Sequence, residues 1–268
     1  MELEPPYRLV RARHGWMLVN ENDLFIGRAI ATYGEFSESE TQFLLDLCRP
    51  GNVLEVGANI GAHTVPLARQ LASRGHKVMA FEPQPAIFQM LCANLALNAL
   101  TNVRAWPYAC GAESGTVAFA EPDYRQPGNF GGVSMGPVRD GLVEAPCVRL
   151  DDIAQLEPVG LLKIDVEGFE RAVLDGARSL IARNRPFVYL ENDRVEGSRE
   201  LIEWLWSAGY RLWWHTPPLF NPANFFGIEE NCYTGVVSVN MLGAPEEADI
   251  GEPPLAPVED SEEHPLKR

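Results

Sequence analysis

A glycine-containing turn between residues 53 and 61 has the residue types of a ligand site. Gly57 and Gly61 flank Asn59 in a G-x-N-x-G pattern, and Glu55 stands two residues before the first glycine. Glycine permits a tight turn and a close approach of the backbone to a ligand. The helix expected after the turn offers free N–H groups to an anion, while Glu55 suits an ammonium group. Dinucleotide-binding folds prefer G-x-G-x-x-G, so the pattern disfavours NAD, although a turn without any ligand is also compatible with it.

Acidic residues also stand at the ends of three later segments that are predicted to be buried strands. Glu82 ends the first, Asp165 and Glu167 end the second, and Glu191 ends the third. Ligands of open α/β sheets bind at the carboxyl ends of the strands, so we expect these acids to meet the glycine turn in one pocket. Glu82 suits ribose hydroxyls there, and a role as a helix N-terminal acid is compatible with that.

The same strand ends provide the candidates for catalysis, which are Asp165, Glu167 and Glu191. Asp165 is the first candidate for a general base, which needs a side chain within reach of the proton it removes. The further candidates for the base are Glu191, His63 and His215. A divalent metal held by Asp165, Glu191 and Asn192 is the alternative, because hard cations take oxygen ligands. The sequence leaves base and metal open, and a lone histidine is more often structural.

Alternating strands and helices must position these residues. Strands are predicted at 52–56, 77–81, 103–108, 161–166, 187–191, 211–215 and 235–240, and helices at 39–48, 62–73, 85–98, 169–184 and 200–208. Two added strands are predicted at 116–120 and 144–150, and a hairpin at 16–33. This order predicts an α/β fold with a mostly parallel sheet that has helices on both faces. Pro66 falls inside one predicted helix, where we expect it to disturb a backbone hydrogen bond.

The predicted organisation is an N-terminal hairpin extension at 1–36, a catalytic domain at 37–242 and a tail at 243–268. The tail is rich in Pro and Glu and poor in aromatic residues, so we expect an acidic, disordered segment. The glycine-rich loop 127–136, with Asn129 and Ser134, is predicted to cover the pocket as a lid, with an ordinary surface loop as the alternative.

Aromatic residues late in the chain suggest further contacts. Trp213, Trp214 and His215 end a predicted strand, so one ring is a candidate for stacking on a flat acceptor, whereas core packing is the default for tryptophan. Phe225 and Phe226 are predicted to be exposed and to offer a contact surface, which would allow a homodimer.

Composition narrows the classes of function. The net charge of −15 over 268 residues argues against a protein that coats nucleic acid, and no apolar run is long enough to insert into a membrane. The five cysteines have neither disulfide-framework nor zinc-site spacing. The first ten residues do not have the order of charges of a signal peptide. These observations predict a cytoplasmic protein with reduced thiols.

Several stretches together resemble the FkbM family of methyltransferases. They are TYGEF (32–36), GANIGAHT (57–64), FEPQP (81–85), RLDDI (149–153), KIDVEGFERAVLDGA (163–177) and NFFGIEEN (224–231). The resemblance runs from about residue 33 to about residue 240. It implies a class I methyltransferase fold with a seven-stranded type of sheet, S-adenosylmethionine as cofactor and O-methylation of a small molecule or glycan. The acceptor hydroxyl implied is that of a sugar, a glycoconjugate or a secondary metabolite.

The resemblance also implies which residues bind the cofactor. The matching positions are Glu55, Gly57, Asn59, Gly61, Glu82 and Asp165, and the residues predicted beside them are Tyr33, His63, Thr64, Pro83 and Ala109. The identity of the acceptor is not carried over. Two other functions stay open, namely an NAD-dependent oxidoreductase and a non-catalytic binding module that has kept the fold.

Overall fold

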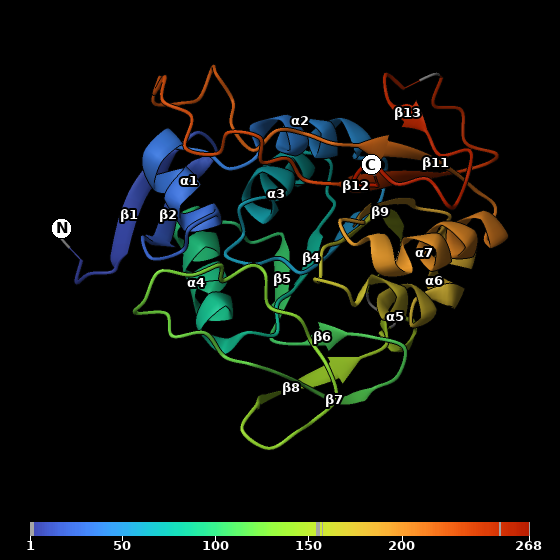
Figure 1. Ribbon diagram of the computed structural model, residues 1–268, viewed down its shortest axis with the longest axis horizontal. Helices are drawn as coiled ribbons and strands as arrows, with labels where there is room; N and C mark the ends of the chain where they lie inside the picture. The colour runs from blue at the N-terminus through green and yellow to red at the C-terminus, as the bar shows by residue number, and fades with distance from the viewer. Residues whose placement is uncertain (1–2, 154–155, 157, 252, 268) are drawn as a thin grey trace.

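The computed structural model describes residues 3–153, 156, 158–251 and 253–267, and its centre is a twisted sheet (Figure 1). Within the described residues the strand order is β13-β11-β12-β10-β9-β3-β4-β5. The strands are β3 (Asn52–Val56), β4 (Val78–Phe81), β5 (Val103–Trp106), β9 (Val159–Ile164), β10 (Phe187–Glu191), β11 (Tyr210–His215), β12 (Asn240–Pro245) and β13 (Ala256–Pro257). The pairs from β5 to β10 are parallel, and β12 runs antiparallel to both β10 and β11.

The central strands are buried on both faces, as parallel strands covered by helices must be. Every residue of β3, β4 and β9 is buried. Going outward from β3, the chain continues through β4 to β5 on one side, whereas β9 and β10 lie on the other. The strand order therefore reverses between β3 and β9, which is where ligands of such sheets bind. This architecture confirms the predicted class I methyltransferase fold.

Helices cover both faces of the sheet (Figure 1). One core joins the sheet to α5 (Glu170–Asp175), α6 (Arg178–Asn184) and α7 (Val195–Ser207). The other core joins it to α2 (Glu38–Leu47) and α3 (Thr64–Ala72). Side chains alternate between the two cores along a strand, so Leu54 and Val56 face α5–α7 while Val53 faces α2 and α3. The side chain of Glu55 consequently leaves β3 on the face that carries α3, with its cavity-lining end at the edge of the sheet.

The segments outside the central sheet pack at its ends. The helix α4 (Pro85–Leu97) follows β4 and contacts the N-terminal hairpin. A three-stranded sheet of order β6-β8-β7 lies apart from the central one. It consists of β6 (Ala109–Cys110), β7 (Gly115–Phe119) and β8 (Val143–Val148), and is followed by the short 3-10 turn Leu150–Asp152. The added strands predicted at 116–120 and 144–150 are thus confirmed.

The N-terminal hairpin exists, but the predicted position at 16–33 is wrong. It consists of β1 (Tyr7–Ala12) and β2 (Gly15–Asn20), and α1 (Ile26–Tyr33) follows it. The polar cluster at 20–23, expected as the turn, lies after the second strand. There Asp23 accepts hydrogen bonds from the N–H groups of Phe25 (3.2 Å) and Gly27 (2.9 Å). A carboxylate that binds free N–H groups starts a helix, so the cluster begins α1.

Three other local predictions need correction. The helix predicted at 169–184 is divided into α5 and α6, with Gly176 at the end of α5. Only glycine fits there, because a Cβ atom would lie 2.0 Å from the backbone oxygen of Gly111. The strand predicted at 235–240 begins only at Asn240 and runs to Pro245. Pro66 does not disturb a helix, because α3 starts at Thr64, and N–H groups in the first turn have no partner within the helix.

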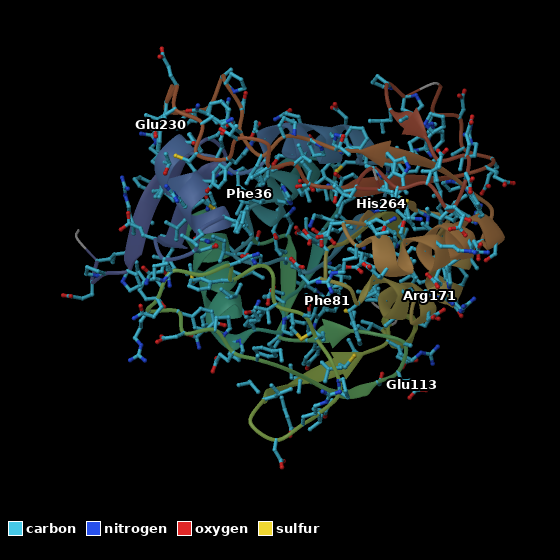
Figure 2. The ribbon with its side chains drawn as sticks, in the orientation of Figure 1. Phe36, Phe81, Glu113, Arg171, Glu230 and His264 are labelled. Carbon is cyan, nitrogen blue, oxygen red and sulfur yellow. The ribbon has the colours of Figure 1, made fainter. Side chains whose placement is uncertain are left out.

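The prediction of a disordered tail is wrong for the described residues from 243 onward. Gly243 to Pro245 belong to β12, and Ala256–Pro257 form β13 against β11. His264 is buried and its Nε2 lies 2.8 Å from the backbone oxygen of Asn192 (Figure 2). Average composition missed these specific pairings with a sheet edge. Residues 1–2, 252 and 268 of the predicted terminal segments lie outside the described residues.

None of the helices among the described residues has the length and apolar character needed to cross a membrane. The described cysteines are free thiols, and Cys48, Cys110 and Cys147 are buried.

Candidate active site

A cavity of about 240 Å³ opens at the carboxyl ends of β3, β4, β9 and β10. A smaller hollow of about 40 Å³ adjoins it, and the two share Gly57, Glu82, Gly131, Asp165 and Glu167 as lining residues. They therefore form one continuous groove across the switch point of the sheet. The cavity has a dense set of carboxylates, which we call the acid wall and which consists of Glu40, Glu55, Glu82, Asp165, Glu167, Glu191 and Asp193.

The glycine turn lies at the centre of this groove. Gly57 has φ +85°, and a Cβ atom on it would lie 1.7 Å from the backbone oxygen of Asp165. The N–H groups of Gly57 and Ala58 both donate to the oxygen of Phe81 at 3.0 Å. Because β3 thus touches its neighbours on both sides at this point, only glycine fits, and the turn brings the ends of β4 and β9 together.

Glu82 is held at the end of β4 by backbone donors. Its two carboxylate oxygens accept from the N–H groups of Asn59 (3.0 Å) and Gln84 (2.9 Å). Burial raises the pKa of Glu82 to about 7. The carboxylate faces both hollows, so it is available to the hydroxyls of a ligand that spans them.

A buried lysine links the acids at the base of the cavity. Lys163 Nζ lies 3.0 Å from Asp165 Oδ2 and 4.0 Å from Glu55 Oε1. Burial disfavours the ammonium group, but Asp165, Glu55 and Glu40 outweigh burial and raise the pKa of Lys163. The hydroxyl of Thr64 donates to Glu55 Oε2 at 2.7 Å. Burial nevertheless raises the pKa of Glu55 to about 7.

Two of these residues, Lys163 and Glu40, were not among the predicted site residues. Glu40 comes from α2, accepts a hydrogen bond from Ser37 (2.9 Å) and has its pKa raised to about 7 by burial. A lysine inside the apolar stretch LLKI of β9 is a signal that sequence reasoning can use, because a buried ammonium group requires acidic partners. Glu40 offers no such signal, since an acid in the first turn of a helix is common.

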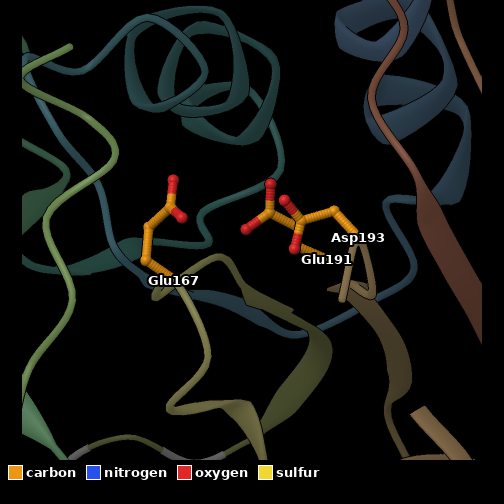
Figure 3. Close-up of side chains that lie close together, drawn as sticks. All are labelled: Glu167, Glu191 and Asp193. Carbon is orange, nitrogen blue, oxygen red and sulfur yellow. The ribbon is translucent and has the colours of Figure 1, made fainter. Parts of the chain in front are cut away.

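Three carboxylates gather where β9 and β10 end (Figure 3). Oxygen atoms of Glu167, Glu191 and Asp193 lie within 4.8 Å of one another. Arg194 pairs with Glu167 at 3.0 Å and lies 3.8 Å from Asp193. The Oε2 atom of Glu191 is buried and has no hydrogen-bond partner among the described residues. Burial, with the nearby charge of Asp165, raises the pKa of Glu191 well above its ordinary value.

Glu167 differs from Glu191 in its surroundings. Its backbone has φ +57°, which is unusual for a residue with a side chain. Burial raises the pKa of Glu167 to about 7, although its ion pair with Arg194 acts in the opposite direction. Arg194 thus engages Glu167 Oε2, whereas Glu191 Oε2 has no hydrogen-bond partner among the described residues.

Comparison with known proteins agrees with this geometry. Residues 55–212 match the model of the methyltransferase FkbM domain. The chain belongs to the FkbM methyltransferase family. It is 29% identical over 188 residues to methyltransferase sdnD of Sordaria araneosa, covering 54% of this chain and 72% of that protein. It is also 30% identical over 235 residues to the 31-O-demethyl-FK506 methyltransferase FkbM of Streptomyces tacrolimicus, covering 71% of this chain and 89% of that protein.

Solved structures show the same fold. A SAM-dependent methyltransferase from Agrobacterium tumefaciens superposes with a TM-score of 0.50 at 11% sequence identity, covering 92% of this chain and 72% of that one. At this identity the likeness concerns the fold alone. Membership in the FkbM family makes the chain a methyltransferase with the class I fold, and the roles of its individual residues are argued below.

Most predicted cofactor residues of this FkbM-family chain lie around the groove. Glu55, Gly57, Asn59, His63, Glu82 and Asp165 line the cavity, and Pro83 and Ala109 line the smaller hollow. Gly61 and Thr64 lie just behind the turn, and Thr64 acts through Glu55. Tyr33 does not line either hollow; its hydroxyl donates to the oxygen of Glu230 (2.9 Å) and accepts from the N–H of Cys232 (2.8 Å).

Asn192, predicted as a metal ligand, and His215, predicted as a candidate base, do not line the cavity. The amide nitrogen of Asn192 donates to Ser198 Oγ at 2.9 Å, and Asn192 does not line the cavity. His215 lies 2.9 Å from the hydroxyl of Tyr189 and packs on Phe43, with ring centroids 4.2 Å apart. The predicted set of Asp165, Glu191 and Asn192 is therefore not brought together, because Asn192 is turned toward α7.

His63 does reach the cavity. It is buried, and its Nε2 atom has no hydrogen-bond partner among the described residues. Burial, with the nearby charge of Lys163, holds the pKa of His63 well below its ordinary value. The imidazole is therefore neutral at physiological pH and offers one uncharged polar atom.

The glycine-rich loop at 127–136 lies against the groove. Asn129 and Gly131 line the cavity, and the Gln84 amide donates to the oxygen of buried Phe130 at 3.0 Å. Ser134 Oγ accepts a hydrogen bond from Arg194 at 3.1 Å. The loop has the position expected of a cover, and its movement as a lid stays a prediction.

The tryptophans show the default of core packing rather than the candidate role of stacking on an acceptor. Trp213 is buried in a core cluster, and Trp214 packs edge-on against His264 with ring centroids 5.2 Å apart. Neither lines the cavity, so stacking of an acceptor on these rings is not provided. Phe225 and Phe226 are exposed, as predicted.

Proposed function

We propose that this chain transfers a methyl group from S-adenosylmethionine to a hydroxyl oxygen of a secondary metabolite, sugar or glycoconjugate. The observation that carries the proposal is the groove itself. It is lined by the glycine turn, by Glu82 and by Glu191, which come from the ends of β3, β4 and β10. Family membership indicates methyl transfer, and the residues that line the groove are the candidates for binding and catalysis.

The cofactor is assigned to the groove by the chemistry of its parts. The smaller hollow, with Pro83, Ala109 and Phe169, suits the adenine ring. Glu82 suits the two ribose hydroxyls, because each of its oxygens keeps a lone pair beyond its backbone bond. The turn and the start of α3 suit the methionyl carboxylate, with the neutral His63 beside it.

The acid wall suits the positive charges of the cofactor. The methionyl ammonium is assigned to Glu55 and Asp165, and the sulfonium lies in the field of the remaining carboxylates. Opposite charge within a few ångströms favours the ionised carboxylate, so cofactor binding is expected to ionise acids whose pKa burial has raised. The product, S-adenosylhomocysteine, has lost the sulfonium charge and gains less from this wall.

The transfer is an in-line displacement. The acceptor oxygen forms a bond to the methyl carbon, the bond from that carbon to sulfur breaks, and its electron pair stays on sulfur. The hydroxyl proton passes to a carboxylate. Holding oxygen and methyl group in line supplies at most about 7–11 kcal/mol of the barrier reduction.

We assign the proton acceptor to Glu191 rather than to Asp165, the first candidate from the sequence. Asp165 Oδ2 is engaged by Lys163 at 3.0 Å, whereas Glu191 Oε2 is without a partner among the described residues. A carboxylate with a raised pKa is also the better base. Asp165 then positions the cofactor, and Glu167 is held by Arg194 at 3.0 Å.

A divalent cation at Glu167, Glu191 and Asp193 is the alternative way to activate the hydroxyl. Arg194 already supplies a positive charge to Glu167 and Asp193, which favours the metal-free route. Dialysis against a chelator is therefore expected to leave the rate unchanged. If the chelator abolishes activity and Mg²⁺ or Mn²⁺ restores it, a bound metal ion rather than a carboxylate base activates the hydroxyl.

The proposal is tested with purified protein, S-adenosylmethionine labelled in the methyl group and an extract of the source organism. Label is expected in an extract component, together with S-adenosylhomocysteine. S-adenosylhomocysteine is also expected to raise the melting temperature, while NAD is not. Stabilisation by NAD alone would favour an oxidoreductase, and cofactor binding without transfer to any acceptor would favour a non-catalytic module.

The free thiols support a cytoplasmic location.

A further inference from the structure

Beside the acid wall, the lining of the cavity has an apolar part. We call it the carbon wall, and it consists of Phe25, Ile26, Phe36, Leu219, Val236, Val237 and Val239. These residues come from three places outside the central strands, namely the start of α1, the turn before α2 and the segment between β11 and β12. Figure 2 shows Phe36 between α1 and α3, toward the interior.

The carbon wall is fixed in place by hydrogen bonds between distant segments. The hydroxyl of Tyr33 bonds to Glu230 and Cys232. Two residues further along the chain, the carboxylate of Glu35 accepts hydrogen bonds from Asn221 Nδ2 and from the N–H of Phe225, each at 2.8 Å. The hydroxyl of Tyr233 donates to the oxygens of Leu24 (3.1 Å) and Phe25 (3.0 Å). The wall is thus a built surface.

Parts of this built surface are exposed although they are apolar. Val236 is 37% exposed and Val237 is 44% exposed, and both line the cavity. Leu24, next to Phe25, is 38% exposed. Exposed apolar side chains that line a pocket are candidates for contact with an apolar ligand. The cofactor parts assigned above do not need it, since they use the turn, the acid wall and the smaller hollow.

The carbon wall also adjoins the carboxylate that we assign as the proton acceptor. Glu191 is the register partner of Asn240 in the β10–β12 pair. The oxygen of Val239 accepts from the N–H of Asn192 at 2.8 Å. A hydroxyl that reaches Glu191 consequently lies near Val239, with Ser238 and Asn240 beside it, so part of the skeleton that carries the hydroxyl lies against the carbon wall.

We infer that the acceptor is a hydroxyl on an apolar carbon skeleton, and not a free sugar or nucleotide. This inference rests on the proposed function. A free sugar presents a hydroxyl on nearly every carbon, and burial of those hydroxyls against valine and phenylalanine without partners is costly. An apolar skeleton gains from the same contact.

The first test separates the two acceptor classes by solubility. After the labelling reaction with source-organism extract, the mixture is partitioned between ethyl acetate and water. Labelled product is expected in the organic phase. Label confined to the aqueous phase would overturn the inference while leaving methyl transfer intact. No label in either phase would overturn the proposed function, and the inference with it.

The second test uses variants of the wall with the recovered acceptor. Val236→Ser and Val237→Ser are each expected to raise the KM for the acceptor about fivefold to tenfold, from the lost apolar contact. Their Kd for S-adenosylhomocysteine is expected to stay unchanged. Val138→Ser is the control, because Val138 is 48% exposed and does not line the cavity. An unchanged acceptor KM in both wall variants would overturn the inference.

Discussion

The two walls of the cavity are built in different ways. The acid wall comes mainly from residues at or just after the ends of parallel strands, so the hydrogen-bond ladder of the sheet sets its positions. The carbon wall comes from segments that belong to no central strand, and its positions depend on bonds such as that from Tyr33 to Glu230. The comparison teaches that the cofactor half of the site is tied to the fold, whereas the acceptor half is free to vary without changing the sheet.

The two walls also destabilise the ligand-free protein in different ways. In the acid wall, burial raises the pKa of Glu55 and Glu82 to about 7, which means that their charged forms are disfavoured. In the carbon wall, Val236 and Val237 expose apolar surface to water. A cationic cofactor relieves the first cost and an apolar acceptor relieves the second. Each ligand is therefore expected to depend on its own wall.

The largest effect is expected where the fold and the acid wall meet. Gly57→Ala places a Cβ atom 1.7 Å from the Asp165 oxygen and adds strain at φ +85°. Gly75→Ala is the matched control, since Gly75 has φ +71° and nothing within 4 Å of its Cβ position. The control is expected to lose about 1–2 kcal/mol of unfolding free energy from backbone strain. Gly57→Ala is expected to lose at least about 2 kcal/mol more, together with binding of S-adenosylhomocysteine. Equal denaturation midpoints would show that the turn tolerates a side chain.

The next effect concerns catalysis at the junction of the two walls. Glu191→Gln is expected to lower kcat at least about 100-fold, because it removes the proton acceptor, and to leave the affinity for S-adenosylhomocysteine unchanged. In the parent protein kcat/KM is expected to rise with pH through a value well above 4.5, because the pKa of Glu191 is raised and the base must be ionised. Glu200→Gln, on the exposed side of α7, is the control. If both variants turn over equally fast, Glu191 is not the base.

The contrast between the walls also explains how much the sequence predicted. Apolar runs that end in glycine or acid indicated β3, β4, β9 and β10 and placed Glu82 and Asp165 correctly at the groove. The carbon wall has no such pattern, because Phe25, Phe36 and Val237 are far apart in the chain and no period relates them. Their approach depends on single hydrogen bonds of tertiary structure.

The terminal segments were missed for a related reason. Composition is an average over the tail, whereas its order comes from a few residues. Val258 is buried and its N–H donates to the oxygen of Leu212 at 2.9 Å. His264 accepts from the N–H of Leu266 at Nδ1 and donates from Nε2 to Asn192. Local pattern analysis does not detect a partner strand more than 40 residues away.

His264 allows a test of whether the tail supports the strand end that carries Glu191. His264→Phe keeps a ring against Trp214 but leaves the buried oxygen of Asn192 without its donor, so a loss of about 1–3 kcal/mol in unfolding free energy is expected. His264→Gln keeps a donor and is expected to recover most of this loss in denaturant titrations. Equal stability of the two variants would mean that packing alone holds the tail.

Tyr33→Phe tests whether the carbon wall affects the acceptor and not the cofactor. It removes one hydroxyl that bridges Glu230 and Cys232, while the ring stays packed near Phe220. The lost bonds are worth about 0.5–1.5 kcal/mol, so a rise of about threefold to tenfold in acceptor KM is expected as the carbon wall loosens. The Kd for S-adenosylhomocysteine, measured by calorimetry, is expected to stay the same. A weaker Kd with an unchanged acceptor KM would instead support the sequence prediction that Tyr33 belongs to the cofactor site.

The last effect is the dependence of ligand-free stability on pH. Burial raises the pKa of Glu40, Glu55 and Glu82 from 4.5 to about 7. The folded protein therefore holds more protons than the unfolded chain between those values, and stability falls as pH rises. His63, with its lowered pKa, acts in the opposite direction up to about pH 6.5, but one imidazole opposes three carboxyls. The melting temperature is expected to fall between pH 5 and pH 8, and to fall less with saturating S-adenosylmethionine, whose charges favour the ionised wall. A melting temperature that rises through this window would mean that these carboxyls are already ionised without the cofactor.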